Sequence, residues 1–150
     1  MTKMVSEARI EKPEIRTLIP HSGSMCLLDC VIRWDNYSIV CTSNTHCDPD
    51  NPLRRHGRLS ALHALEYGAQ AAALHGGLRA RALGGTAPLG YLAALRDARL
   101  HAERLDDISS PLQIFAKHLF GEGANTVYEC RVSAGDALIA EGRVTILQRK

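Results

Sequence analysis

The sequence predicts an α+β protein in which an antiparallel sheet wraps around one long central helix. Three observations carry this prediction: an N-terminal hairpin, one apolar helical stretch, and a series of alternating strands that extends to the C-terminus. Residues 60–83 are apolar or small on nearly every face of a helix in their first part, which is typical of a helix buried within a protein. A helix of this kind needs a sheet that curls around it.

The N-terminal part of the chain predicts a short helical turn followed by a hairpin. Residues 13–19 can form one helical turn with proline at its start. Residues 25–34 and 37–45 are apolar enough for two strands, and Asp35-Asn36 between them is a turn sequence. The first dozen residues are polar, so we expect 1–12 to be loosely ordered.

The central helix has clear start and stop signals. Ser60 is a good N-cap, and Gly84-Gly85 predicts the end of the helix. Each glycine inside a helix costs up to about 1 kcal/mol relative to alanine. Three glycines lie within this one, which favours close packing against a sheet: Gly68, Gly76 and Gly77.

The C-terminal half predicts an antiparallel meander. Its expected strands span 89–105, 112–120, 126–133 and 137–147, and in the last of these Leu138, Ala140, Val144 and Ile146 are expected to share a face. The order of hairpin, long helix and strands is that of the hotdog fold, here as a single domain over 1–150. One protomer would leave a side of the helix and a sheet edge uncovered. We therefore expect dimerisation with the sheets joined edge to edge.

Composition excludes several classes of function. The 150 residues carry a net charge of +2 with dispersed basic residues, which does not favour nucleic acid binding. No apolar run approaches the roughly 20 residues of a membrane span, and the polar N-terminus lacks a signal-peptide core, so we expect a cytoplasmic protein. The five cysteines form no zinc pattern, so we expect them to be reduced and expect no metal site.

Glu66 is the candidate catalytic residue. It is the only acidic residue between Asp50 and Asp97 and lies in an apolar stretch of the helix. A carboxylate there is costly to bury unless it is paired, solvated or protonated. Its alternative role is a structural carboxylate bonded to backbone N–H groups or to an arginine across the dimer. Gln70, one turn further on, would share its surface and orient the carboxylate or a water.

Two segments of the chain resemble β-hydroxyacyl-acyl-carrier-protein dehydratases. Ile19-Pro20-His21, followed by Met25-Cys26-Leu27-Leu28-Asp29, is similar to their opening motif, and Leu65–Gly76 (LEYGAQAAALHG) is similar to their central-helix motif. NPLRRHGRL and GYLAALRDARL are typical of dehydratase-like hotdog proteins from aryl polyene and related fatty-acid-type gene clusters. The resemblance implies a catalytic acid at Glu66. It also implies a substrate carried on the phosphopantetheine of an acyl carrier protein, with no other cofactor.

The chain departs from that family at its catalytic histidine. In the family a loop histidine before the helix works with the helix acid of the other subunit, and the ungapped equivalent here is Pro52. His46 is the first candidate replacement and His56 the second. His63 and His21 are further candidates, and a local His63–Glu66 ion pair is an alternative use of His63.

Three arginines crowd the entrance to the helix: Arg54, Arg55 and Arg58. Cations are unfavourable at a helix N-terminus, so we expect them to bind substrate, through the phosphopantetheine phosphate or the acidic surface of an acyl carrier protein. The alternative is an ordinary solvated loop.

Three functions compete. The first is a 3-hydroxyacyl-acyl-carrier-protein dehydratase, active as a homodimer or as one subunit of a heterodimer whose partner supplies the missing histidine. The second is a hotdog thioesterase, which uses a helix carboxylate without that histidine. The third is a non-catalytic hotdog subunit that supports a partner dehydratase. The sequence leaves the acyl chain unidentified.

Overall fold

The computed structural model describes residues 9–19, 23–85, 90–121 and 125–148. Its helices are α1 (Lys12–Ile15) and α2 (Ala64–Ala82), with three short 3₁₀ helices, η1 (Gly23–Met25), η2 (Thr45–Cys47) and η3 (Ala61–His63). Its strands are β1 (Ile10–Glu11), β2 (Cys30–Trp34), β3 (Ser38–Ser43), β4 (Gly90–Leu100), β5 (Leu112–Phe120), β6 (Asn125–Ala134) and β7 (Ala137–Gln148). The expected hairpin, central helix and C-terminal strands are all present.

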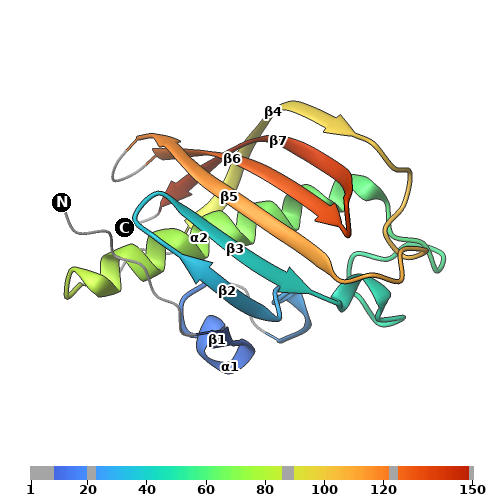
Figure 1. The fold of residues 1–150 in the computed structure, drawn as a ribbon, viewed down its shortest axis with the longest axis horizontal. Coiled ribbons are helices and arrows are strands. Elements are labelled where there is room, and N and C mark those ends of the chain that lie inside the picture. Colours follow the sequence, from blue (N-terminus) through green and yellow to red (C-terminus); the bar gives the residue numbers. More distant parts are fainter. Residues whose placement is uncertain (1–8, 20–22, 86–89, 122–124, 149–150) are drawn as a thin grey trace.

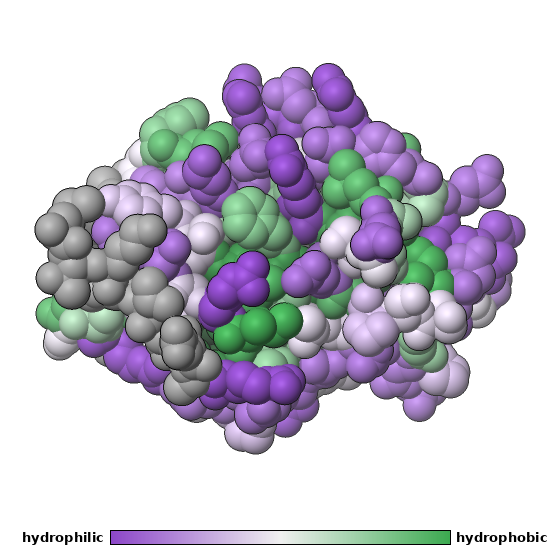
Figure 2. Space-filling model, viewed as in Figure 1, coloured by the Kyte–Doolittle hydropathy of each residue, from purple (hydrophilic) through white to green (hydrophobic). Residues whose placement is uncertain are grey.

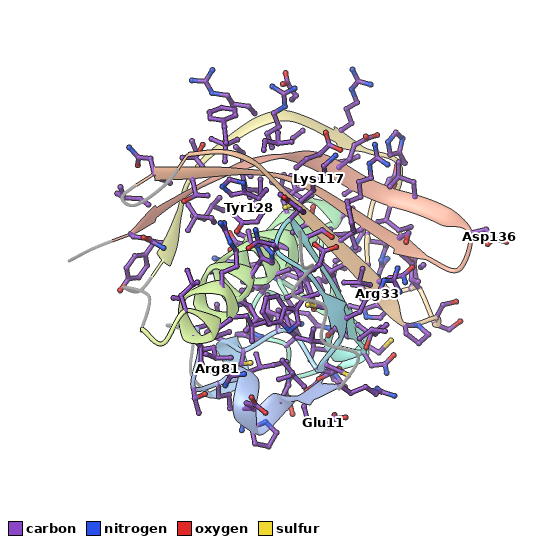
Figure 3. All side chains as sticks on the ribbon, turned by 60° about the vertical axis from the view of Figure 1, so that its left-hand side comes forward. Glu11, Arg33, Arg81, Lys117, Tyr128 and Asp136 are labelled. Carbon is purple, nitrogen blue, oxygen red and sulfur yellow. The ribbon has the colours of Figure 1, made fainter. Side chains whose placement is uncertain are left out.

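The strands form one antiparallel sheet that curls around α2. Its order is β1-β2-β3-β5-β6-β7-β4, so β4 lies at an edge although it directly follows the helix in sequence. In Figure 1 the long helix runs along the inner side of the curved sheet, and Figure 3 views the molecule so that the helix lies in the hollow of the sheet. Figure 2 views the outer side, where hydrophilic residues cover most of the face. The predicted α+β hotdog fold is confirmed.

The N-terminal elements differ in detail from the expectation. The short helix α1 carries proline in its first turn, as predicted. Ile10 and Glu11 are not loose, because they pair with Val31 and Cys30 of β2. The expected strand over 25–34 begins only at Cys30, since η1 takes up Met25 and the residues between them form no strand.

Ser60 acts as a cap, as predicted, but α2 itself begins four residues later, at Ala64. The Ser60 side chain accepts a hydrogen bond from the Leu62 N–H at 3.2 Å, so Ser60 caps η3, which leads into α2. The helix needs a glycine at position 68, because a Cβ there would lie 2.8 Å from the Cβ of Cys130 on β6. The prediction of close packing between helix and sheet is confirmed at Gly68.

Two bulges set the orientation of side chains along β4. Strict alternation would place Leu92 and Leu95 on opposite faces, yet they pair with Ile146 and Val144, which both point inward and are buried. The pairing shifts once between Leu92 and Ala94 and again between Arg96 and Arg99. Each extra residue shifts the inward–outward alternation of the side chains by one position. The leucines therefore face the helix, and Arg96 and Arg99 face outward. This strand ends at Leu100, short of the expected residue 105.

A third bulge lies in β7 and overturns one expectation. Val132 pairs with Ala140 but Ser133 pairs with Leu138, so Ile139 is the extra residue. Ile139 and Ala140 are consequently buried, whereas Leu138 remains 37% exposed and does not share the inner face.

The β4 side of the molecule is left open. Leu95 and Leu100 are 40% and 44% exposed although they point to the inner face, because no described element of the chain covers the end of β4. Among the described helices, none is long and apolar enough to cross a membrane.

Candidate functional site

Glu66 lies in the first turn of α2 and is half-buried. Within the described part of the chain, no hydrogen bond or ion pair engages its carboxylate, and none joins it to His63. The local pair with His63 is therefore absent here, and no described backbone N–H or arginine of the same chain holds the carboxylate. A partly desolvated carboxylate without a partner can accept or give a proton to a bound molecule.

The carboxylate belongs to the open side of the helix. Ala73 lies seven residues after Glu66 and therefore on the same face of α2. Ala73 packs beside Gly90, the first residue of β4. Leu62, one turn before Glu66 on this stripe, is 48% exposed. Glu66 thus faces the side of the molecule on which β4 presents its uncovered leucines.

Gln70 is used inside the protein. Its side-chain oxygen accepts a hydrogen bond from the Leu27 N–H at 2.9 Å, and its amide nitrogen donates to the Met25 carbonyl at 2.6 Å. Only 1% of the residue is exposed. The expected role beside substrate does not fit this position, because both ends of the amide hold the 25–27 backbone against the helix.

A buried hydroxyl network fixes the loop that precedes the helix. Tyr67, adjacent to Glu66, places its phenol 2.7 Å from the Thr45 hydroxyl and accepts a hydrogen bond from the Asn51 side chain at 3.2 Å. Thr45 in turn donates to the Leu27 carbonyl at 2.8 Å. The network ends at Asn51, directly before Pro52, where the family histidine would stand. The loop is therefore held firmly at the position that lacks this histidine.

His46 does not reach Glu66. Its imidazole is fully buried, and its Nε2 lies 2.9 Å from the Ile108 carbonyl in the β4–β5 connection. Burial lowers the pKa of His46, which favours the neutral ring. A base that faces the Glu66 of another subunit would need to be accessible, so the expected catalytic role of His46 does not fit this position.

The other histidines occupy separate places. His56 is exposed at the tip of a tight turn. His75, which sequence reasoning passed over, is buried between the Tyr128 hydroxyl at 2.7 Å and the Asp35 carbonyl at 2.8 Å, and burial lowers its pKa to about 4. His21 lies outside the described residues.

The three arginines at the helix entrance divide into two groups. Arg54 turns inward, where its guanidinium donates to the Gly57 carbonyl at 3.1 Å and the His46 carbonyl at 3.0 Å. Its expected contact with substrate is not favoured by this geometry. Arg55 and Arg58 flank a two-residue turn and line a pocket of about 250 Å³. The pocket is completed by Leu53, Ser60, His63, Glu103 and Arg104.

Arg104, which lines this pocket, belongs to a segment that is hydrogen-bonded to the helix entrance. Asp106 accepts a hydrogen bond from the Leu59 N–H at 2.8 Å and from the Arg104 Nε at 3.0 Å. Leu105 donates to the Leu59 carbonyl at 2.7 Å. Sequence reasoning missed Arg104 and Asp106, because they lie more than 40 residues from the loop that they contact.

Substitution of Asp106 by asparagine is expected to lower the melting temperature at pH 7 by several degrees. The bonds from Arg104 hold the pKa of Asp106 below its usual range, so the carboxylate stabilises the fold above the ordinary carboxyl pKa of about 4. That contribution is lost as the pH falls toward the lowered pKa. The difference in melting temperature between the two proteins should therefore be constant at neutral pH and narrow as the pH falls below about 4, and a difference that stays the same down to pH 3 would contradict this account.

Comparison with known proteins identifies the family. The family model described as ApeP-like (ApeP dehydratase) matches residues 13–150. The chain belongs to the ApeP-like dehydratase family. As an ApeP-like dehydratase it is a dehydratase-type hotdog protein, which agrees with the motif around Glu66.

Solved structures share the fold of this ApeP-like dehydratase. The dehydratase heterocomplex ApeI:P from Xenorhabdus doucetiae contains a chain that is 23% identical, with a TM-score of 0.80 and 91% of each chain covered. AziG from S. sahachiroi is 16% identical, with a TM-score of 0.61 over 89% of this chain and 98% of its own. A putative thioesterase from Shewanella oneidensis is 12% identical, with a TM-score of 0.53 over 75% and 76%. No curated protein matches the sequence.

Proposed function

We propose that this chain is the carboxylate-bearing subunit of an enzyme that dehydrates a β-hydroxyacyl thioester carried by an acyl carrier protein. In this reaction a base removes the α-proton, an acid protonates the leaving β-hydroxyl, and the products are the enoyl thioester and water. Glu66 is the proposed acid. The observation that carries the proposal is its half-buried carboxylate on the open side of the central helix, which no hydrogen bond or ion pair from the described residues engages.

The base is proposed to come from a second hotdog subunit. Pro52 replaces the family histidine, His46 is buried against Ile108, and His75 is buried against Tyr128. Pro52 has no imidazole, and the two buried histidines do not offer an accessible ring to Glu66. A histidine supplied from outside the chain would complete the pair without a change in the loop that Asn51 and Tyr67 hold in place.

The edge strand β4 is the proposed docking site of that subunit. Its inward-facing Leu95 and Leu100 remain exposed, and among the described strands β4 has only β7 as a neighbour in the sheet. An unpaired edge with apolar side chains favours addition of another strand. The similar fold of a chain in the ApeI:P dehydratase heterocomplex supports a partner that differs from this chain.

The test compares the chain alone with the chain mixed with a candidate hotdog partner from the same gene neighbourhood. Both preparations receive a β-hydroxyacyl thioester on an acyl carrier protein, and products are followed by mass spectrometry. We expect the enoyl thioester from the mixture and little or none from either subunit alone. Release of free acid and thiol would instead favour a thioesterase, and no product with a complex that forms normally would favour a non-catalytic subunit.

A further inference from the structure

We propose, on the basis of the thioester substrate above, that the pocket between Arg55, Arg58 and Arg104 binds the phosphate of a 4′-phosphopantetheine arm. The pocket lies at the N-terminal end of α2, at the right-hand end of the molecule in Figure 1. His63 lines it and stands one helical turn before Glu66. A phosphate bound there would lie at the same end of the helix as the proposed catalytic carboxylate.

The turn holds two guanidinium groups on one side. Arg55 and Arg58 exchange backbone hydrogen bonds of 2.8 Å and 2.9 Å across the turn, so they form a directly opposed antiparallel pair. The residues between them, His56 and Gly57, have φ angles of 52° and 74°, which is the left-handed backbone of a type I′ turn. Side chains of a directly opposed pair point to the same face, and both arginines do line the pocket.

This arrangement is unfavourable without an anion. Like charges directly opposite one another destabilise an antiparallel pair. Within the described residues, no ion pair engages Arg55 or Arg58, whereas Arg104, which also lines the pocket, is paired with Asp106 and lies 4.0 Å from Asp107. Among the described residues that line the pocket, Glu103 is the one carboxylate and pairs with neither turn arginine, so the unpaired positive charge lies on Arg55 and Arg58. Two guanidinium groups held side by side are well suited to the oxygens of one phosphate.

The helix terminus adds little to the site. The Leu62 N–H is bonded to the Ser60 side chain, the Ala61 N–H to the Glu103 carbonyl and the His63 N–H to the Ser60 carbonyl. The first backbone donors are therefore occupied. Recognition of the anion must come from side chains, chiefly those of Arg55 and Arg58.

The pocket volume of about 250 Å³ is small for a drug-sized ligand but suits a phosphate with the adjoining part of its arm. Acyl carrier protein and coenzyme A both carry this phosphate on the same pantetheine chain. The shared chemistry is thus a phosphate ester next to pantetheine, from either source.

The direct test measures binding of 4′-phosphopantetheine and of pantetheine, which lacks the phosphate, by calorimetry or by NMR titration. We expect the purified protein to prefer the phosphorylated compound by about tenfold or more, and Arg55→Ala and Arg58→Ala each to remove most of this preference. Arg33→Ala is the matched control, because Arg33 is an exposed arginine elsewhere on the surface with no described ion pair (Figure 3). Equal binding of the two compounds, no binding of either, or a preference retained in the Arg55/Arg58 double variant would overturn the proposal.

Two further experiments distinguish this site from the proposed catalysis and identify the source of the phosphate. Glu66→Gln should keep the preference for phosphopantetheine even if dehydration is lost, so the two proposals can fail independently. In the active complex, loss of Arg55 and Arg58 should raise KM for both the coenzyme A and the carrier-protein thioester. An increase for the carrier-protein substrate alone would indicate docking of an acidic protein surface and would contradict a phosphate site.

Discussion

Replacement of Glu66 by glutamine is expected to lower the rate of enoyl thioester formation about 10²–10⁴-fold in the complex with its partner. The amide keeps the shape of the side chain but cannot protonate the leaving hydroxyl, and acid or base groups typically contribute rate factors of this size. Because no described hydrogen bond or ion pair depends on Glu66, the fold should tolerate the change. Single-turnover measurement of enoyl formation separates this chemical effect from substrate binding.

Glu11→Gln is the matched control for that experiment. Glu11 is an exposed carboxylate on β1, remote in sequence from the helix and labelled in Figure 3. The control should leave the rate within about twofold of the unmodified complex, as expected for surface substitutions. An unchanged rate in Glu66→Gln would exclude this residue as the acid, and an altered melting temperature would reveal a structural role instead.

Replacement of Gly68 by alanine is expected to destabilise the protein by about 1–2 kcal/mol. The new Cβ would lie 2.8 Å from the Cβ and 3.0 Å from the Sγ of Cys130, which is itself fully buried. The Cβ of Cys130 is fixed to the backbone of β6 and cannot rotate away. Helix or strand must therefore shift, at a cost that exceeds the gain of about 1 kcal/mol in helix propensity.

Gly76→Ala provides the comparison within the same helix. Among the described residues, a Cβ at Gly76 meets only the flexible end of Gln148, at 3.8 Å. This variant keeps the gain in helix propensity without the clash, so its free energy of unfolding should rise by up to about 1 kcal/mol. Chemical denaturation of both variants should show shifts of opposite sign. Shifts of the same sign would mean that helix propensity, rather than contact with β6, decides the effect.

The sequence was sufficient for the fold because its signals are local. The central helix is bounded by Ser60 and by Gly84-Gly85, and its apolar character on most faces requires a surrounding sheet. The bulges in β4 and β7 were harder to predict, since they depend on which residue of the neighbouring strand lies opposite. The odd spacing of Leu92, Leu95 and Leu100 was a signal of them that simple alternation ignores.

The site was predictable in part for the same reason. Glu66 stands out by composition, and its place on the helix follows from the sequence. The positions of the other candidates depend on their contacts. His46 contacts Ile108 and Gln70 contacts Leu27, and both contacts join segments that are distant in sequence. Arg54 contacts Gly57 in its own loop. A list of polar residues near the helix entrance cannot show which of them turn inward to hold the backbone.

The bulges of β4 also bear on solubility before assembly. A long, flat edge strand with exposed leucines can add strands from other copies without limit and so begin aggregation. Here the strand is interrupted at Ala93 and again at Asp97, whose φ of 55° breaks the extended backbone, and its arginines point outward. The irregular edge of β4 favours pairing with a strand of matching irregular shape over pairing with a flat strand. A newly made subunit can thereby keep an open edge for its proper partner and remain protected from indiscriminate stacking.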